Sequence, residues 1–147
     1  RTADGRWSAV RTLAVVIGSD TLVPGLAPWS LDGRFLACGC GSGGLVIVPV
    51  AGGSARRLPS PFSTAGWAFP QWSADGRTIF HISEDSGRAI AVVAVPVSGA
   101  APRVVVRFDD PTRPWHRFGF RVGAGRFFFT LGDRQSDIWV AEVAAMK

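Results

Sequence analysis

The chain has 147 residues, of which 47% are hydrophobic and 18% are charged. This balance excludes intrinsic disorder, which combines low hydrophobicity with high charge, and it allows one folded domain with a substantial core. No run approaches the roughly 18 apolar residues of a transmembrane helix, so we expect no membrane segment in this chain. The net charge of +5 comes almost entirely from arginines scattered along the sequence, which argues against nucleic-acid binding.

Short β-strands are predicted along the whole chain, because 18 glycines and 10 prolines leave few windows long enough for a helix. Residues 12–17 resemble an outer strand, and residues 18–26 are expected to form a connection. The clearest unit follows later, with strands predicted at 68–73, 77–82, 89–97 and 103–108. Asp75-Gly76 is expected to make a tight turn between the first two, since glycine accepts positive φ.

A sequence repeat identifies the architecture. Residues 28–36 (PWSLDGRFL) recur 43 positions later as residues 71–79 (QWSADGRTI), and a weaker copy, residues 120–128 (FRVGAGRFF), follows after another 49. A period of about 40–45 residues with four short strands per unit is typical of β-propeller blades. We therefore predict an all-β fold, a β-propeller with about 3.4 four-stranded blades present, as part of a larger ring. The predicted units are residues 1–26 (partial), 27–66, 67–117 and 118–147 (partial).

The two ends of the chain differ in this scheme. The last unit contains predicted strands at 126–131 and 137–143 but no fourth strand, and closing blades often take that strand from the other end of the chain. We expect a natural C-terminus and an N-terminus cut from a larger propeller. A second copy of the chain could also complete the ring.

Tryptophan, cysteine and histidine residues in the predicted strands could in principle bind a ligand or a metal, but packing roles are expected for them. Trp29 and Trp72 precede their turns at equal offsets, and we expect them to pack between blades rather than to stack on a ligand. Cys38 and Cys40 are expected to lie on one face of a strand, as small half-buried residues rather than metal ligands. His81 is expected to be a half-buried strand residue.

The repeated Trp-Ser-x-Asp-Gly-Arg, followed by Val48-Pro49-Val50 and Val95-Pro96-Val97, resembles the WD-like repeat of TolB-like propellers. The C-terminal segment with Ile138-Trp139-Val140 is similar to the last blade of propellers at the C-terminus of bacterial serine/threonine kinases. The resemblance covers about residues 13–143 and departs in the third copy, which lacks the aspartate. It implies six or so blades, a periplasmic or otherwise extracytoplasmic setting, and a binding role in signalling.

Catalytic signatures are missing from the sequence. There is no Gly-x-Ser-x-Gly nucleophile elbow, the only histidines are His81 and His116, and no acidic loop has calcium-binding spacing. The glycines at 123 and 125 precede a strand rather than a helix, so they are expected to form a hairpin turn and not a phosphate loop. We therefore predict no enzyme activity, no metal and no cofactor.

Charged and aromatic residues gather in the predicted loops that join strands two to three and strand four to the next unit. These loops should open on one face around the mouth of the central channel, where arginine and aromatic side chains favour partner binding. The candidate residues are Trp67, Glu84, Asp85, Arg88, Arg113, Trp115, His116, Asp133, Arg134 and Asp137.

Three functions remain open at this point. The first is a non-catalytic module that binds a protein or peptide as the sensor or interaction part of a larger signalling protein. The second is the gating propeller of a prolyl-oligopeptidase-like hydrolase, which requires a catalytic domain beyond Lys147. The third is a stand-alone propeller enzyme such as a lactonase, for which too few metal ligands are available.

Overall fold

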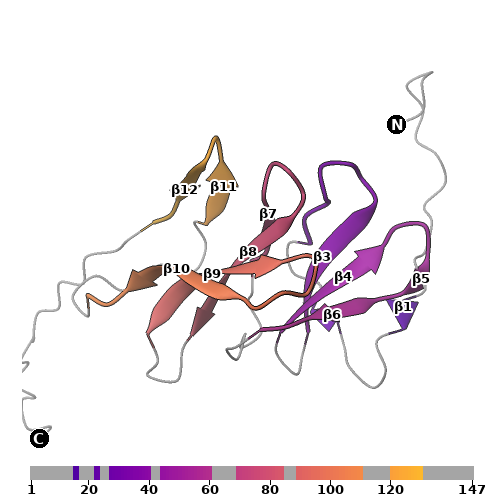
Figure 1. Ribbon diagram of the computed structural model, residues 1–147, viewed down its shortest axis with the longest axis horizontal. Coiled ribbons are helices and arrows are strands. Elements are labelled where there is room, and N and C mark those ends of the chain that lie inside the picture. The colour runs from indigo at the N-terminus through magenta and orange to yellow at the C-terminus, as the bar shows by residue number, and fades with distance from the viewer. Residues whose placement is uncertain are drawn as a thin grey trace, which may run out of the picture.

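The computed structural model describes residues 15–16, 22–23, 27–40, 44–60, 69–84, 89–110 and 120–130, and the statements below concern these residues. Within them the fold is all-β, and no helix occurs. No helix in the described ranges is therefore long and apolar enough to cross a membrane. The strands form two four-stranded antiparallel sheets and two short two-stranded pairs (Figure 1).

The first four-stranded sheet has the strand order β2-β3-β4-β6. Its members are β2 (Leu22–Val23), β3 (Phe35–Cys40), β4 (Leu45–Pro49) and β6 (Arg56–Leu58). Strand β2 corrects the sequence prediction, which assigned residues 18–26 to a connection. Leu22 and Val23 pair with Cys40 and Gly39 of β3. These two apolar residues therefore add one short strand to the edge of the sheet.

The second four-stranded sheet has the order β10-β9-β8-β7 and repeats the arrangement of the first. Its members are β7 (Gln71–Trp72), β8 (Thr78–Glu84), β9 (Ile90–Pro96) and β10 (Arg103–Phe108). All four fall at the predicted places, with β7 shorter than expected and β8 two residues longer at its end. Trp72 pairs with Ile79 across β7 and β8, and Trp29 bridges Leu36 at the equivalent position of the first sheet.

Two shorter pairs flank these sheets. Strands β11 (Arg121–Gly123) and β12 (Arg126–Phe128) form the hairpin predicted for the third repeat copy. Strand β1 (Val15–Val16) falls within the predicted outer strand, but it pairs in parallel with β5 (Gly53–Ser54) of the first repeat. The predicted strand at 137–143 lies outside the described residues.

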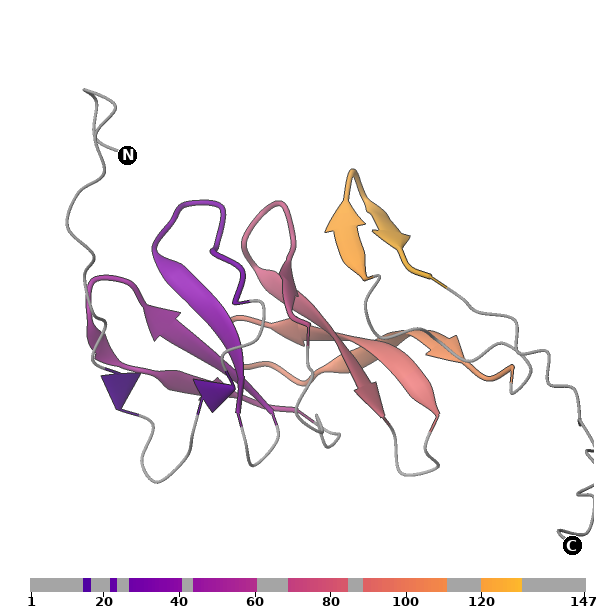
Figure 2. The same ribbon diagram turned by 180° about the vertical axis from the view of Figure 1, so that it is seen from behind.

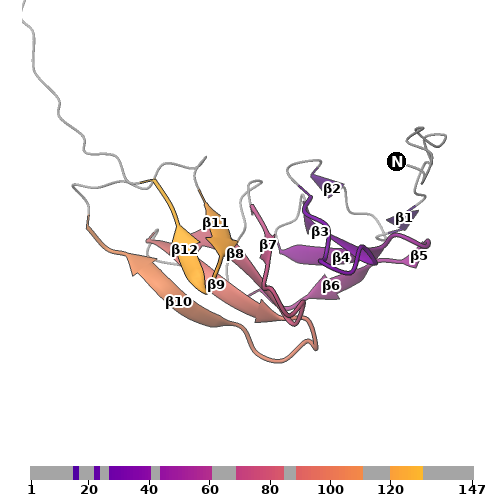
Figure 3. The ribbon, with the colours of Figure 1, turned by 90° about the horizontal axis from the view of Figure 1, so that it is seen from above.

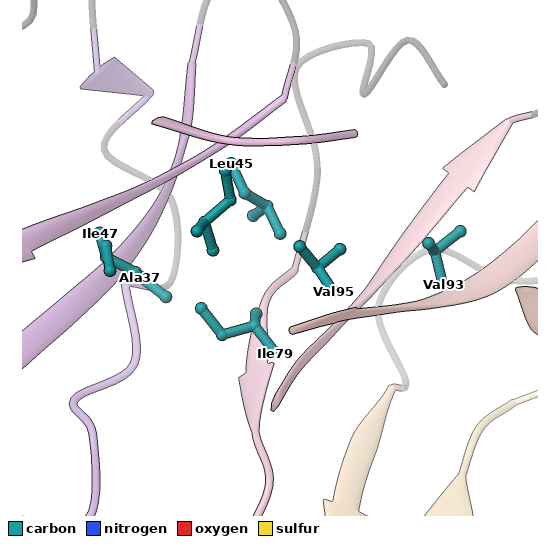
Figure 4. Close-up of a cluster of buried hydrophobic side chains, with 7 residues drawn as sticks. Ala37, Leu45, Ile47, Ile79, Val93 and Val95 are labelled. Atoms are coloured by element: carbon teal, nitrogen blue, oxygen red, sulfur yellow. The ribbon is translucent and has the colours of Figure 1, made fainter. Parts of the chain in front are cut away.

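The main hydrophobic core lies between the two four-stranded sheets. The buried residues Ala37, Leu45, Ile47 and Leu58 of the first sheet pack with Ile79, Val93 and Val95 of the second. Figure 4 shows Leu45 of the first sheet facing Ile79 and Val95 of the second. The sheets are therefore stabilised by burying their facing surfaces against each other, since neither sheet covers both of its own faces.

The opposite face of the second sheet packs against the β11–β12 hairpin. Phe120 and Val92 are buried there with Ile82, and Phe127 packs against them. Phe80 and Phe127 make an edge-to-face ring contact with centroids 5.1 Å apart. The units thus follow one another in a row, with β6 and β10 on one side and β2, β7 and β11 on the other (Figure 3).

Two long-range hydrogen bonds also join the first and second repeats. The indole Nε1 of Trp72 donates to the carbonyl oxygen of Pro28 over 3.0 Å. The guanidinium of Arg56 donates to the carbonyl oxygen of Val97. The two bonds connect the repeats at separate places. The first involves Trp72 of β7, and the second involves Val97, in the turn after β9.

The two repeat tryptophans have different environments. Trp72 is partly buried and packs against the core between the sheets, as predicted. The same prediction is wrong for Trp29, which is 57% exposed. The first sheet lies on one side of Trp72, whereas the described residues include no four-stranded sheet on the corresponding side of Trp29.

Candidate binding groove at the hairpin turns

The repeated Ser-x-Asp-Gly-Arg motif builds the same hydrogen-bonded turn in both four-stranded sheets. In the first, Ser30 Oγ donates to Asp32 Oδ1 over 2.6 Å, and the backbone N–H of Phe35 donates to Ser30 Oγ over 2.9 Å. In the second, Ser73 Oγ donates to Asp75 Oδ1 over 2.6 Å, and the N–H of Thr78 donates to Ser73 Oγ over 2.9 Å. The motif therefore encodes turn geometry, with the serine and aspartate satisfying backbone donors.

Glycine follows the aspartate in each turn because the backbone there is left-handed. Gly33 has φ of 69° and Gly76 has φ of 68°, a region that side chains rarely adopt. The hydrogen bond from the serine, followed by that from the backbone N–H of the arginine, lowers the pKa of both turn carboxyls, Asp32 and Asp75. The predicted turn with glycine at positive φ is confirmed in both copies.

Substituting Ser73 with alanine tests this account of the motif. In Ser73→Ala the pKa of Asp75 should rise toward its ordinary value of 3.8, because the largest cause of its lowering is removed. The pKa of Asp32 should stay unchanged, since its own serine is intact. NMR titration of the two carboxyl groups checks both values. Equal pKa values of Asp75 in the variant and the wild type would contradict the assigned role of the serine.

The third repeat copy makes a shorter turn. Gly123 pairs with Arg126, so that only Ala124 and Gly125 lie between the strands. Both residues have positive φ, at 49° and 70°, as in the two-residue turns of β-hairpins. Alanine stands where the other copies have aspartate, and the third turn therefore carries no carboxylate.

The turns of the three successive repeats point in the same direction, as both the front and the back views show (Figures 1 and 2). A groove of about 510 Å³ lies between them. All three repeats contribute to its lining, which consists of Pro28, Trp29, Leu31, Gln71, Trp72, Ser73, Ala74, Phe80, Val122, Gly123, Ala124, Gly125, Arg126 and Phe127. Its volume falls within the range of about 300–1,000 Å³ that is usual for ligand sites.

The groove is mainly apolar and open to solvent. Trp29 is 57% exposed and Leu31 is 82% exposed, which is unusual for side chains of this size in the described part of the chain. Neighbouring apolar side chains that remain exposed together are typical of interaction surfaces. Arg126 is the one charged residue in the lining, and it too is exposed. The groove can therefore bind an apolar group next to the guanidinium of Arg126. The hydroxyl of Ser73 in its lining is held within its own turn by Asp75 and by the backbone N–H of Thr78.

Metal binding has no support among the described residues, where no group of three or more His, Cys, Asp and Glu side chains could hold an ion. Asp32 and Asp75 line a second hollow of about 400 Å³ beside the groove. Their Oδ1 atoms accept hydrogen bonds within their own turns, so these atoms are already engaged.

Of the ten residues predicted from the sequence to form a binding face, the structure describes only Glu84. Glu84 ends β8, opposite the turn that contains Asp75. The remaining predicted residues lie outside the described ranges and are not brought together with Glu84 by any observation: Trp67, Asp85, Arg88, Arg113, Trp115, His116, Asp133, Arg134 and Asp137. Sequence reasoning did not find the groove. A signal was present, because an apolar residue precedes the turn aspartate in both copies of the motif, Leu31 in the first and Ala74 in the second.

The two cysteines and His81, for which the sequence predicted no ligand role, lie in strands rather than in the groove. His81 is fully buried, more than predicted, and burial lowers its pKa to about 4 despite the opposing effect of the hydrogen bond between Nδ1 and the carbonyl oxygen of Ile82. Cys38 and Cys40 lie in one cluster, as expected for two residues on one strand face, but both are buried rather than half-buried as predicted, and they form no disulfide with each other. Burial, and next the neighbouring Cys40, raises the pKa of Cys38, which makes it a weak nucleophile at neutral pH.

Comparison with known proteins adds no relative to this description. No family model matches the chain, and no curated protein matches it.

Proposed function

We propose that the two four-stranded sheets and the β11–β12 hairpin are successive blades of a β-propeller. Three observations support this. The sheets have the same strand order and the same turn motif, they pack face to face, and the third unit packs on the far face of the second. Face-to-face repetition of four-stranded units is how propellers bury their sheets.

We further propose that the protein is a non-catalytic binding module for a protein or peptide, acting as the sensor or interaction part of a larger signalling protein. The observation that carries this proposal is the exposed apolar groove across the turns of three repeats. A rigid sheet scaffold that presents aromatic side chains in an open groove suits recognition of an extended segment. The groove replaces the opposite loop face as the preferred binding surface.

Selection of binding peptides from a random displayed library on the full chain tests this function. We expect selected peptides to lose binding to Leu31→Asp, which places a charge in the groove while changing a side chain that is 82% exposed. The matched control is Glu84→Gln on the opposite loop face, which should leave binding unchanged. Peptides that respond only to the Glu84 variant would move the binding site to that face. A selection that enriches no peptide would contradict the binding function.

A further inference from the structure

Three arginines occupy the same position in three successive turns. Arg34, Arg77 and Arg126 each follow the turn glycine, and each is exposed. In the first two turns the arginine has an aspartate two residues before it, and each pair interacts electrostatically. The positive charge of these two arginines is therefore balanced locally.

The third arginine has no such balance. Ala124 stands where the other turns carry aspartate. No hydrogen bond or ion pair of the Arg126 side chain is found in the part of the chain that the structure describes. Arg126 also lines the groove, whereas Arg34 and Arg77 do not. Among the residues that the structure describes, no carboxylate thus pairs with the guanidinium of Arg126 at the edge of the groove.

The opposite part of the groove offers an aromatic surface. Trp29 and Leu31 come from the first repeat, and Phe127 stands beside Arg126 in the third. An apolar side chain bound there would cover exposed indole and leucine surface, and a neighbouring carboxylate could accept two parallel hydrogen bonds from Arg126. The net charge of +5 would also favour approach of an acidic partner.

We infer that the groove binds an acidic peptide segment in which an aromatic or large apolar side chain occupies the surface of Trp29 and Leu31 and an adjacent carboxylate pairs with Arg126. This inference depends on the proposed binding function and specifies its partner. An extended segment fits better than an enclosed small molecule, because the lining comes from three repeats and its largest side chains stay in solvent. Arg126 is thereby a specificity residue, and Trp29 and Leu31 provide the apolar contact.

The test compares two synthetic peptides that differ in one charge, acetyl-Gly-Phe-Glu-Gly-amide and acetyl-Gly-Phe-Gln-Gly-amide, on the full chain by NMR titration. The acidic peptide should bind about 10-fold more tightly, as one charge-assisted hydrogen-bonded pair provides. Arg126→Gln should abolish this preference. Arg77→Gln, the matched arginine beside Asp75, should retain it. Trp29→Ala should weaken both peptides, because it removes the apolar surface that they share.

Three results would overturn the inference, and they can be told apart. If both peptides bind equally, or if the library selection yields groove peptides without acidic residues, the acid preference is wrong while the binding function stands. If neither synthetic peptide binds and the selection enriches none, the inference fails together with the proposed function. If the preference for the acidic peptide survives Arg126→Gln but disappears in Arg77→Gln, the peptide carboxylate pairs with Arg77, and the assignment to Arg126 is wrong.

Discussion

Replacing Trp72 with alanine is expected to lower the free energy of unfolding by about 3 kcal/mol, the cost typical of truncating a packed tryptophan. The indole packs against the core that both sheets share, and its Nε1 donates the hydrogen bond to Pro28 of the preceding repeat. Truncation would leave a cavity between the sheets and an unsatisfied carbonyl. Chemical denaturation followed by circular dichroism measures the change.

Trp29 is the matched control for this prediction. It occupies the same motif position 43 residues earlier, but its side chain is 57% exposed. Trp29→Ala should therefore cost less than about 1 kcal/mol, as is usual for surface positions. Equal losses in the two variants would show that the environments of the two rings are the same, which would contradict the packing described for Trp72.

The protein is expected to lose about 3 kcal/mol of stability between pH 6.5 and pH 4 through His81 alone. Burial lowers the pKa of this imidazole to about 4 in the folded state, against an ordinary value of 6.5 in the unfolded chain. The unfolded state therefore binds the proton first as the pH falls. The stabilisation is fully present above pH 6.5 and is lost progressively down to the folded-state pKa, at about 1.4 kcal/mol per pH unit.

Valine at position 81 provides the control. His81 faces the same side of β8 as the core residue Ile79, and no described residue forms a hydrogen bond with its Nε2. His81→Val removes both the titrating group and this unsatisfied atom, so the variant should lose the pH dependence in this window and match or exceed the wild type at pH 7. Denaturant titrations at several pH values test this. A wild-type stability that is flat from pH 6.5 to 4.5 would contradict the buried neutral imidazole.

The two turn carboxyls, Asp32 and Asp75, titrate at lower pH than His81 and do not obscure this result. The pKa values of Asp32 and Asp75 are lowered below 3.8. Their contribution to stability is therefore present above that value and is lost only as the pH falls further. Measurements above pH 4.5 isolate the histidine from these two carboxyl groups.

Much of the local structure could be predicted from the residues alone. The spacing of breakers and β-branched runs located the four strands of the second sheet, and the Asp-Gly pair located its turn at Gly76. These features depend on short-range physics, namely backbone conformation and hydrogen bonds within a few residues. The parallel pairing of Val15–Val16 with Gly53–Ser54 could not be predicted this way, because it joins residues far apart in the chain.

The groove could not be located from the sequence. Loop residues with charged and aromatic side chains pointed to the face of Glu84, whereas the groove lies at the turns that contain Leu31 and Ala74. Identical motif positions also received different environments, as Trp29 and Trp72 show. Exposure depends on which surface packs beside a residue, and a repeat by itself does not specify its neighbours.

The sequence by itself determined that the fold is all-β, that its units repeat, and that Asp-Gly turns with glycine at positive φ recur in the two best copies of the repeat. Only the tertiary structure decided that three turns meet around one groove, that Arg126 lies at its edge, and that His81 is fully buried. The physical reason is the range of the interactions. Turn and strand preferences act within a few residues, while burial, grooves and charge balance arise where separate repeats pack together.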